Sequence, residues 1–240
     1  MKIVAHRGFS GKCPENTLKA FNGAFDHAEF GKKIIGFETD IQLSSDDRIV
    51  IYHDIEIEAG GKKVPVGSLS YCELKEAAKP KLRGENICLL EDLLKLSQHR
   101  TELLIEIKAG KFDYDLLMDK LAVLFKSYRP VSGEIILHSF SLDIMDKVLA
   151  EPGLNNLKYG VLCSSYEEFK KFDRIMDRID YVHPSWKSLL ENPDKFASAG
   201  KPFHVWTVND KDTFKKVTSL PCAKLIRAVM TDELDIICGC

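Results

Sequence analysis

Short apolar runs rich in Val, Ile and Leu recur along the chain, and longer stretches with helical spacing separate them. This alternation of strands and helices predicts a parallel sheet with crossover helices. Eight strands are expected, at 3–6, 35–41, 103–107, 134–138, 158–162, 179–183, 203–207 and 225–230. Eight repeats in a chain of 240 residues predict the α/β class and a closed (β/α)8 TIM barrel.

The stretches between these strands supply the expected helices. They span 17–28, 114–125, 142–150, 166–172 and 211–218. Ser70 with Glu73, and Ser164 with Glu167, have the spacing of a capping box, in which both side chains satisfy free N–H groups at the start of a helix.

A further apolar run at 48–53 breaks the alternation, because only "SSDD" separates it from the strand at 35–41. A parallel crossover needs about a dozen residues or more, so these two runs are expected to form an antiparallel hairpin. Residues 55–90 also have no place in the alternation, and they read as a short hairpin and a helix inserted at the barrel mouth. No repeat or low-complexity linker divides the chain, so residues 1–240 are expected to form a single domain.

The hairpin has a consequence for polar residues on its strands. With the turn centred between Ser45 and Asp46, His53 would lie opposite Glu38. Side chains two residues apart point to the same face of a strand, so Asp40 would join them. We therefore expect this hairpin to gather two carboxylates and a histidine.

Polar side chains also follow most of the other predicted strands. In barrels of this type the catalytic residues lie at the carboxyl ends of the strands. The polar side chains there are His6, Arg7, Glu38, Asp40, Glu106, Lys108, His138, Ser139, His183, Trp206, Thr207, Asn209, Thr231 and Asp232.

Three of these side chains are carboxylates aimed at one cavity: Glu38, Asp40 and Glu106. Their repulsion in a low dielectric would be severe without compensation. Pairing with Lys or Arg is the usual solution for a buried acid, but a hard divalent cation suits this oxygen-rich set better. We expect one Mg²⁺, Ca²⁺ or Mn²⁺ ion here.

Two cations at the same strand ends, Arg7 and Lys108, complete the charge balance. Three carboxylates, a divalent cation and a phosphodiester together leave two negative charges, which these side chains would neutralise. Arg can bind phosphate oxygens bidentately and Lys acts as a point charge. The site is therefore suited to an anionic substrate.

His6 and His53 supply two groups for proton transfer. The reference pKa of histidine is about 6.5, so one ring can act as a base and the other as an acid near neutrality. The alternative is that either ring is a satisfied core residue.

The other histidines are less informative. His27 and His99 fall in helical stretches and are expected to be structural. His138, His183 and His204 could be either structural or functional, although the position of His183 at a strand end favours a ligand-facing role.

The charge balance and the apolar runs exclude several classes of protein. Lys and Arg number 34 against 36 Asp and Glu, giving a formal net charge of −2, so a nucleic-acid partner is not expected. Met1 leads into a strand rather than a secretory signal, and no apolar run approaches the ~18 residues of a membrane span.

The seven cysteines are scattered, and none has the Cys-x-x-Cys spacing of a zinc site. This usage is typical of a reduced chain, so a cytoplasmic location is expected. The terminal Cys238-Gly239-Cys240 is expected to be a frayed tail. The residues around Cys13 indicate no role for it.

The motifs "HRG", "PENT", "E-x-D", "HD", "EIK", "SF", "WTVN" and "TD" occur in this order between His6 and Asp232. The ordered set resembles the glycerophosphodiester phosphodiesterases, whose fold is a (β/α)8 barrel with a small insertion after the HD motif. The resemblance implies hydrolysis of glycerophosphodiesters to sn-glycerol 3-phosphate and an alcohol. The implied partner is thus a small-molecule substrate, and the oligomeric state stays open.

The resemblance also implies roles for matching residues. Glu38, Asp40 and Glu106 would bind the divalent metal ion. His6 and His53 would be the acid–base pair. Either water or the glycerol 2-hydroxyl could be the attacking group.

Five further residues match the motifs. Arg7 and Lys108 would hold the phosphate, and Trp206 would line the glycerol or head-group side. Glu15 and Asn16 would brace the first loop. The family usually carries Arg-Thr-Thr after "HD" and a proline after "TD", and this chain has neither, which leaves the head-group preference open.

Three alternative functions also stay open. A phospholipase acting on lysolipids or sphingolipids could use a similar site, but it would need an apolar docking loop that 55–90 does not clearly provide. A metal-dependent aldolase barrel has less use for two histidines at strand ends. A non-catalytic phosphate-binding barrel would need no proton-transfer groups.

Overall fold

Eight parallel strands close into a barrel in the computed structural model, which describes residues 1–97, 101–128 and 133–240. The barrel strands are β1 (Lys2–His6), β2 (Ile34–Leu43), β7 (Glu102–Ile107), β8 (Ile135–Ser139), β9 (Lys158–Cys163), β10 (Tyr181–Pro184), β11 (Phe203–Val205) and β12 (Ile226–Thr231). They pair in this order, and β12 pairs with β1 to close the barrel. The predicted strands and the predicted (β/α)8 fold are confirmed.

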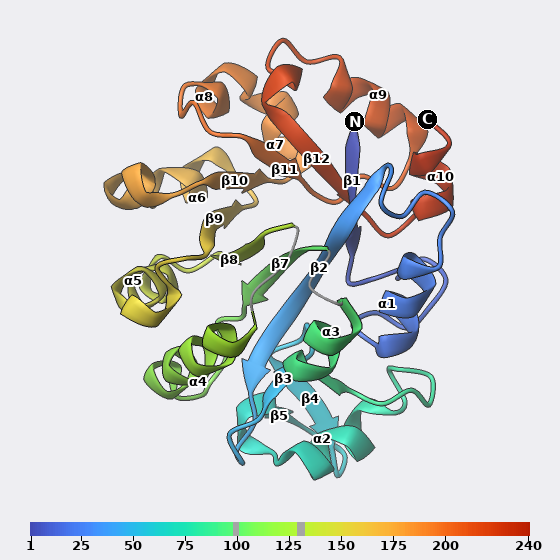
Figure 1. Cartoon of the computed structure of the whole chain (residues 1–240), viewed down its shortest axis with the longest axis vertical. Coiled ribbons are helices and arrows are strands. Elements are labelled where there is room, and N and C mark those ends of the chain that lie inside the picture. Colours follow the sequence, from blue (N-terminus) through green and yellow to red (C-terminus); the bar gives the residue numbers. More distant parts are fainter. Residues whose placement is uncertain (98–100, 129–132) are drawn as a thin grey trace.

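Helices surround the strands on the outside of the barrel (Figure 1). They are α1 (Leu18–Phe25), α3 (Leu90–Ser97), α4 (Tyr114–Ser127), α5 (Leu142–Ala150), α6 (Tyr166–Lys170), α7 (Trp186–Glu191), α8 (Pro193–Ala197), α9 (Lys211–Thr218) and α10 (Leu234–Cys238). The predictions at 142–150 and 211–218 match α5 and α9 in full. The helix expected at 17–28 is shorter, because the backbone N–H of Asp26 already closes the last turn of α1.

The start of α6 differs by one residue from its prediction. Ser165, not Ser164, is the N-cap, and its hydroxyl accepts from the backbone N–H of Glu168. The Glu168 carboxylate in turn accepts from the N–H of Ser164. The capping-box prediction of Ser164 with Glu167 is therefore wrong, because two adjacent serines and two adjacent glutamates offer the same spacing in two registers.

Alternation along the strands separates the core from the site. On β2, Phe37 and Ile41 pack into the core between the barrel and its helices, while Glu38 and Asp40 lie on the other face of the strand. A separate apolar cluster lies inside the barrel and consists of Val4, Leu104, Ile136, Tyr181, Ala228 and Met230. This apolar filling supports the polar residues at the strand ends.

The strand β2 continues beyond the barrel and pairs there with β3 (Ile49–Ile51). This pairing is antiparallel, so the predicted hairpin is confirmed. Its register joins Ile41 to Ile51, and this shifts His53 by one position relative to Glu38. The predicted pairing of His53 opposite Glu38 is therefore wrong, because Asp47 adopts a left-handed conformation (φ 60°) and lengthens the turn by one residue.

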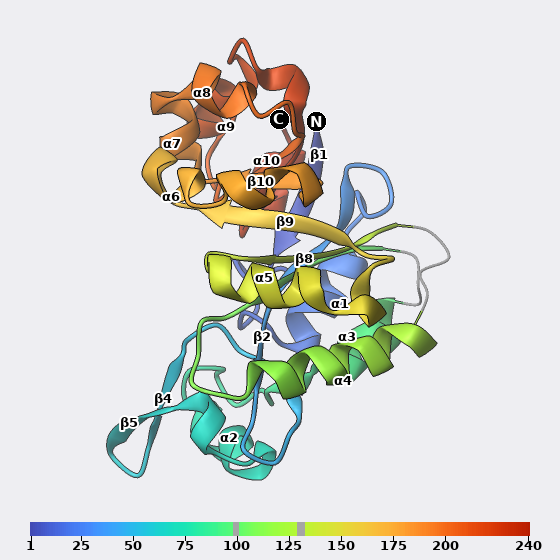
Figure 2. The ribbon, with the colours of Figure 1, turned by 90° about the vertical axis from the view of Figure 1, so that its left-hand side faces the viewer.

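Residues 55–90 form the expected hairpin and helix, β4 (Glu56–Ala59) with β5 (Lys62–Pro65), followed by α2 (Tyr71–Ala78). The predicted capping box of Ser70 and Glu73 is present at the start of α2. The segment ends in β6 (Cys88–Leu89), which pairs with β3. Figures 1 and 2 place β4, β5 and α2 together at one end of the molecule, beside β2.

The C-terminal helix packs against the rest of the fold as far as Cys238. Cys238 is buried at the end of α10, and its carbonyl accepts from the Lys33 ammonium. The frayed-tail prediction is wrong for this residue because the helix packs against the core. All seven cysteines lie in the described ranges and are free thiols.

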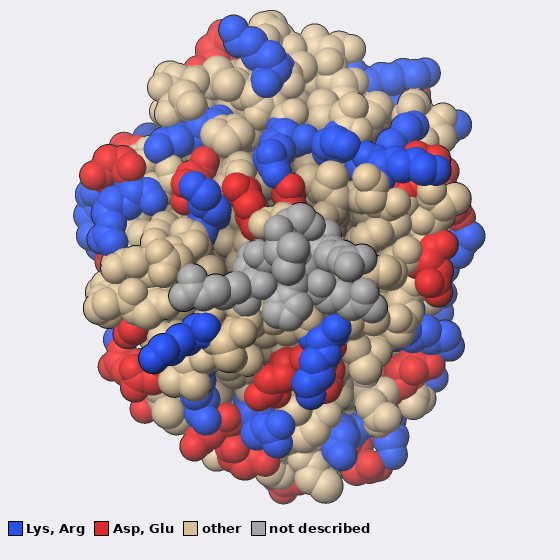
Figure 3. All heavy atoms as spheres, in the orientation of Figure 1, with Lys and Arg blue, Asp and Glu red and all other residues tan. Residues whose placement is uncertain are grey.

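Among the described residues, no helix is both long enough and apolar enough to cross a membrane. Lys and Arg side chains alternate with Asp and Glu over the face in Figure 3. This interspersed pattern agrees with the formal net charge of −2.

Candidate active site

Three buried carboxylates meet at the carboxyl ends of β2 and β7. One oxygen each from Glu38, Asp40 and Glu106 lies within 4.8 Å of the other two. The strand register causes this meeting, because Asp40 and Glu106 are direct partners in the ladder between β2 and β7. Glu38 Oε2 has no hydrogen-bond partner among the described residues. These oxygens fit a hard divalent cation in number and in chemistry.

The pKa shifts of the three carboxylates also favour a bound cation. Burial and the neighbouring Asp40 raise the pKa of Glu38 well above its usual value. Burial and Asp40 likewise raise the pKa of Glu106 to about 8. Burial also opposes the charge of Asp40, but Arg7 and Lys108 outweigh it and lower its pKa to about 2. Further positive charge in the cluster would favour the ionised forms of Glu38 and Glu106.

Arg7 and Lys108 both lie against these acids. The Lys108 ammonium is 2.9 Å from Glu106 Oε1 and 3.3 Å from Asp40 Oδ1. Arg7 Nε is 3.3 Å from Asp40 Oδ2. The pairing of buried acids with Lys or Arg, which the sequence left as an alternative, is thus also present at Asp40 and Glu106. Two cationic side chains, Arg7 and Lys108, therefore lie next to the carboxylates.

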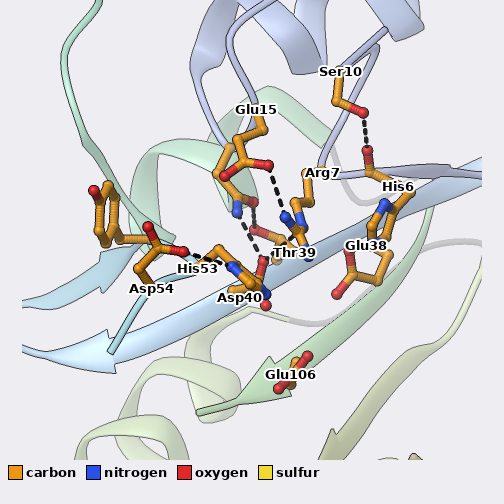
Figure 4. Close-up of polar contacts among 12 residues, drawn as sticks. His6, Arg7, Ser10, Glu15, Glu38, Thr39, Asp40, His53, Asp54 and Glu106 are labelled. Atoms are coloured by element: carbon orange, nitrogen blue, oxygen red, sulfur yellow. Dashed lines mark hydrogen bonds and ion pairs between the residues drawn. The ribbon is translucent and has the colours of Figure 1, made fainter. Parts of the chain in front are cut away.

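The first loop is fixed by Glu15 and Asn16, as Figure 4 shows for its labelled members. Arg7 Nη1 donates to Glu15 Oε2 at 2.7 Å. The buried Asn16 donates from Nδ2 to Asp40 Oδ2 at 2.8 Å and accepts from the Thr39 hydroxyl. Its φ of 58° is left-handed, a conformation that Asn tolerates better than most residues. The loop thereby orients both the guanidinium and the Asp40 carboxylate.

His6 lies at the end of β1 with its ring held by Asp232. Its Nδ1 is 2.7 Å from Asp232 Oδ1, and its Nε2 is 3.7 Å from Glu38 Oε2. The hydroxyl of Ser10 and the amide of Asn209 also donate to the Asp232 carboxylate. Burial opposes the charge of Asp232, but its hydrogen bonds from His6 and its other partners outweigh burial and lower its pKa.

His53 lies just beyond β3 with a similar arrangement. Its Nδ1 is 2.9 Å from Asp54 Oδ1. The backbone leaves the ladder after Tyr52, and the Gln42 amide fixes it there by donating to the carbonyls of Tyr52 and Asp54. This departure brings His53 close enough to Asp40 for their charges to interact, despite the altered register. Burial lowers the pKa of His53.

Sequence reasoning assigned no role to Asp54 or Asp232, although each lay within a quoted motif. The signals were the "HD" and "TD" pairs at strand ends. In each pair the carboxylate faces Nδ1 of a histidine, which favours the tautomer with a proton on Nδ1. The Nε2 atoms are then free to take up a proton.

Two cavities reach side chains that contact the carboxylate cluster, Lys108 in one and Arg7 in the other. One, of about 750 Å³, is lined by the insertion and by Lys108. The other, of about 600 Å³, is lined by the first loop and the end of β12. His53, Asp54 and Lys81 line both.

Trp206 lies elsewhere on the barrel mouth, after β11. Its indole donates to the His183 carbonyl at 2.7 Å, and its ring meets Phe140 edge-on at 5.5 Å. Among the described residues that line the two cavities, Trp206 does not appear. Its substrate-lining role stays a prediction.

The side chain of His183 lines neither of the two cavities, and its ligand-facing role stays a prediction. The side chains of His138, His183 and His204 are fully buried inside the barrel, and His138 Nδ1 lies 2.9 Å from His183 Nδ1. The rings of Tyr181 and His204 flank the ring of His183. Burial lowers the pKa of His183 to about 3.

His27 and His99 were both expected to be structural. His27 Nε2 lies 3.1 Å from Asp235 Oδ1, and His27 Nδ1 accepts from the backbone N–H of Glu29. It lies away from the carboxylate cluster, in the turn that follows α1. His99 lies outside the described residues.

The strand ends of this parallel barrel hold a carboxylate cluster that can bind a cation, two histidines paired with aspartates, and two cationic side chains. This combination is typical of barrel enzymes that act on anionic esters. Comparison with known proteins makes the assignment specific. The model of the glycerophosphoryl diester phosphodiesterase family matches residues 6–236. The chain therefore belongs to this family of phosphoric diester hydrolases, and the resemblance seen in the sequence is confirmed.

Individual relatives agree with this assignment. A glycerophosphodiester phosphodiesterase of Caldanaerobacter subterraneus is 28% identical over 90% of this chain and 88% of its own. A solved structure of a glycerophosphodiester phosphodiesterase from Thermotoga maritima is 26% identical, with a TM-score of 0.72 over 99% of this chain and 96% of its own. A phosphodiesterase from Oleispira antarctica, solved with its product sn-glycerol-3-phosphate, is 22% identical with a TM-score of 0.79 over 97% and 93% of the two chains.

Proposed function

We propose that this chain hydrolyses glycerophosphodiesters to sn-glycerol 3-phosphate and an alcohol, with a divalent cation and two histidines. The observation that carries the proposal is the pairing of His6 with Asp232 and of His53 with Asp54 around one carboxylate cluster. The product bound to the Oleispira relative supports the substrate class.

Glu38, Asp40 and Glu106 would hold the cation, and Mg²⁺, Ca²⁺ and Mn²⁺ all suit their oxygen ligands. When bound, the ion supplies positive charge that polarises a phosphoryl oxygen. The unpartnered Glu38 Oε2 and the raised pKa values of Glu38 and Glu106 support this assignment.

Arg7 and Lys108 would bind the phosphate. Both side chains already lie within 3.3 Å of Asp40, Arg7 at Oδ2 and Lys108 at Oδ1, so both reach the cluster. Glu15 holds one end of the guanidinium, which orients the rest of the group. The two cations would stabilise the charge that builds up on the phosphate oxygens during the reaction.

His6 and His53 would move the protons. With Nδ1 held by an aspartate, each ring presents Nε2 to the substrate. One ring, neutral at the start, takes the proton from the attacking oxygen on Nε2. The other starts as the doubly protonated imidazolium and gives its Nε2 proton to the departing alkoxide. Both water and the glycerol 2-hydroxyl fit as the attacking group, and a substrate that lacks this hydroxyl separates the two routes, because turnover by the cyclic route would stop.

The test is release of glycerol 3-phosphate from glycerophosphocholine, after chelation and with each cation restored. His53→Gln is expected to lose about 10²-fold or more in kcat, the contribution of a general acid or base. His27→Gln is the matched control, because His27 also pairs with an aspartate but lies away from the cluster. Absence of turnover on every glycerophosphodiester with every cation would overturn the proposal, as would equal effects of the two substitutions. Lysolipids are the next substrates to try in that case.

A further inference from the structure

One side chain of the insertion reaches both loops of the candidate active site. Lys81 follows α2, and its ammonium lies 2.6 Å from Asp54 Oδ2 and 3.0 Å from Glu15 Oε1. The same ammonium lies over the Tyr52 ring, 5.1 Å from its centre. Lys81 therefore joins the insertion to the segment after β3 and to the loop after β1.

We propose that Lys81 is a positioning residue for the reaction, holding His53 through Asp54 and Arg7 through Glu15. The inference deepens the proposed function and rests on it. It gives the insertion a direct part in the site, beyond forming one wall of a cavity.

The first line of contacts leads to His53. The two oxygens of Asp54 have different partners, since Oδ1 faces His53 Nδ1 at 2.9 Å and Oδ2 accepts from Lys81. Two partners fix the plane of a carboxylate, and this plane sets the orientation of the imidazole. The Asp54 side chain is 46% exposed, so without Lys81 it could turn towards solvent.

The second line of contacts has the same form and leads to Arg7. Glu15 Oε1 lies against Lys81, while Oε2 accepts from Arg7 Nη1 at 2.7 Å. One ammonium thus fixes two carboxylates, each of which orients a functional group through its other oxygen. Loss of this ammonium would loosen both groups together.

A comparison of the two histidines shows why His53 depends on an ion pair. The partner of His6, Asp232, is also held by Ser10 and Asn209, both close to it in the folded site. Among the described residues, the Asp54 carboxylate has hydrogen bonds only with His53 and Lys81. Lys81 therefore does for Asp54 what two hydrogen-bond donors do for Asp232.

The alternative is that Lys81 serves only to attach the insertion. Partly exposed ion pairs contribute little to folding stability, so Lys81→Met is expected to fold with a Tm close to that of the wild type. Lys79→Met is the matched control, because Lys79 lies two positions earlier and pairs with Glu76 of its own helix. A change in catalysis without a change in Tm separates the two roles.

The experiment measures kcat and KM on glycerophosphocholine. Lys81→Met is expected to lower kcat by about tenfold to 10²-fold through misplacement of His53, with a smaller rise in KM through Arg7. Lys81→Arg is expected to restore most of kcat, because a guanidinium can bridge the same two carboxylates. Lys79→Met should match the wild type in both constants.

A double-mutant cycle tests the route through Asp54. If Lys81 acts through this carboxylate, Lys81→Met lowers kcat little further in an Asp54→Asn background. Effects that multiply, or a kcat for Lys81→Met within about twofold of wild type, would overturn the proposal.

A measurement without turnover keeps this inference distinct from the proposed function. The ring signals of His53 in a proton–nitrogen NMR spectrum are assigned by their loss in His53→Gln. They are expected to shift in Lys81→Met and not in Lys79→Met. If the wild-type protein turns over no glycerophosphodiester, the proposed function fails, and the NMR comparison alone decides whether Lys81 positions the ring. Unchanged ring signals would refute that role.

Discussion

At the scale of single residues, the site depends on carboxylates that hold histidines. His6 and Asp232 lie 226 positions apart in the sequence and 2.7 Å apart in space. No local pattern connects residues at such a separation, so sequence reasoning found the histidine and left its partner without a role. Lys81 was missed for a related reason, because it lies in the segment after α2, where no periodic pattern indicates which way a side chain points.

The sequence did predict that the three carboxylates lie close together, because the spacing of two of them within one strand is visible in the sequence. Glu38 and Asp40 are two residues apart and must share a face of β2. The approach of Glu106 then followed from the parallel pairing of neighbouring strands. The structure brings together the three carboxylates, both cations and both histidines that the sequence proposed for the site.

The pairing of Asp232 with His6 gives a prediction at this scale. Asp232→Asn is expected to lower kcat by about 10²-fold or more, because the neutral amide neither stabilises a protonated imidazole nor selects its tautomer. The Nδ1 contact is the cause, so KM should change much less. Asp235→Asn removes the partner of His27 and is the control. Equal losses in the two variants would argue against a specific role for Asp232.

At the scale of elements, the periodic pattern of apolar residues predicted the strands and helices. Two predictions that failed concern a turn, between β2 and β3, and a helix cap, at the start of α6. The hairpin of β2 and β3 was expected, but its register depends on the left-handed Asp47, which the sequence does not reveal. The start of α6 moved by one residue because Ser164 and Ser165 are adjacent. In both cases the alternatives differ by one residue in register, which the local sequence pattern does not distinguish.

The corrected cap of α6 can be tested directly. Ser165→Ala is expected to lower the free energy of unfolding by about 1 kcal/mol, the usual cost of a lost N-cap. Ser164→Ala should cost clearly less, because only the backbone N–H of Ser164 takes part in the cap. Urea denaturation of the two variants measures the difference. A larger loss for Ser164→Ala would mean that the helix begins one residue earlier.

At the scale of the whole molecule, the barrel encloses histidines that stay neutral when folded. Burial lowers the pKa of His183 to about 3 and that of His204 well below its ordinary value. The unfolded chain takes up protons on these rings below a pH of about 6.5, while the folded chain does not. Their contribution to stability is therefore complete above this pH and is lost as the pH falls towards 3.

Comparison of His204→Phe with the wild type isolates this effect. Between about pH 6 and pH 5, the variant should lose less free energy of unfolding, by up to about 1.4 kcal/mol per pH unit. The raised pKa values of Glu38 and Glu106 act in the opposite direction, so the slope of the wild type alone is not diagnostic. Urea denaturation at several pH values gives both slopes. Identical slopes would show that His204 is already charged in the folded protein.

The pairing of β1 with β12 has a consequence for how the protein becomes active. These are the first and last strands of the chain, and the contact between His6 and Asp232 crosses the seam where they meet. A chain still emerging from the ribosome has its first histidine long before it has the aspartate that orients it. Activity is then a late event of folding: in a refolding experiment, turnover should return only with these non-local contacts, after the helical signal in circular dichroism has recovered.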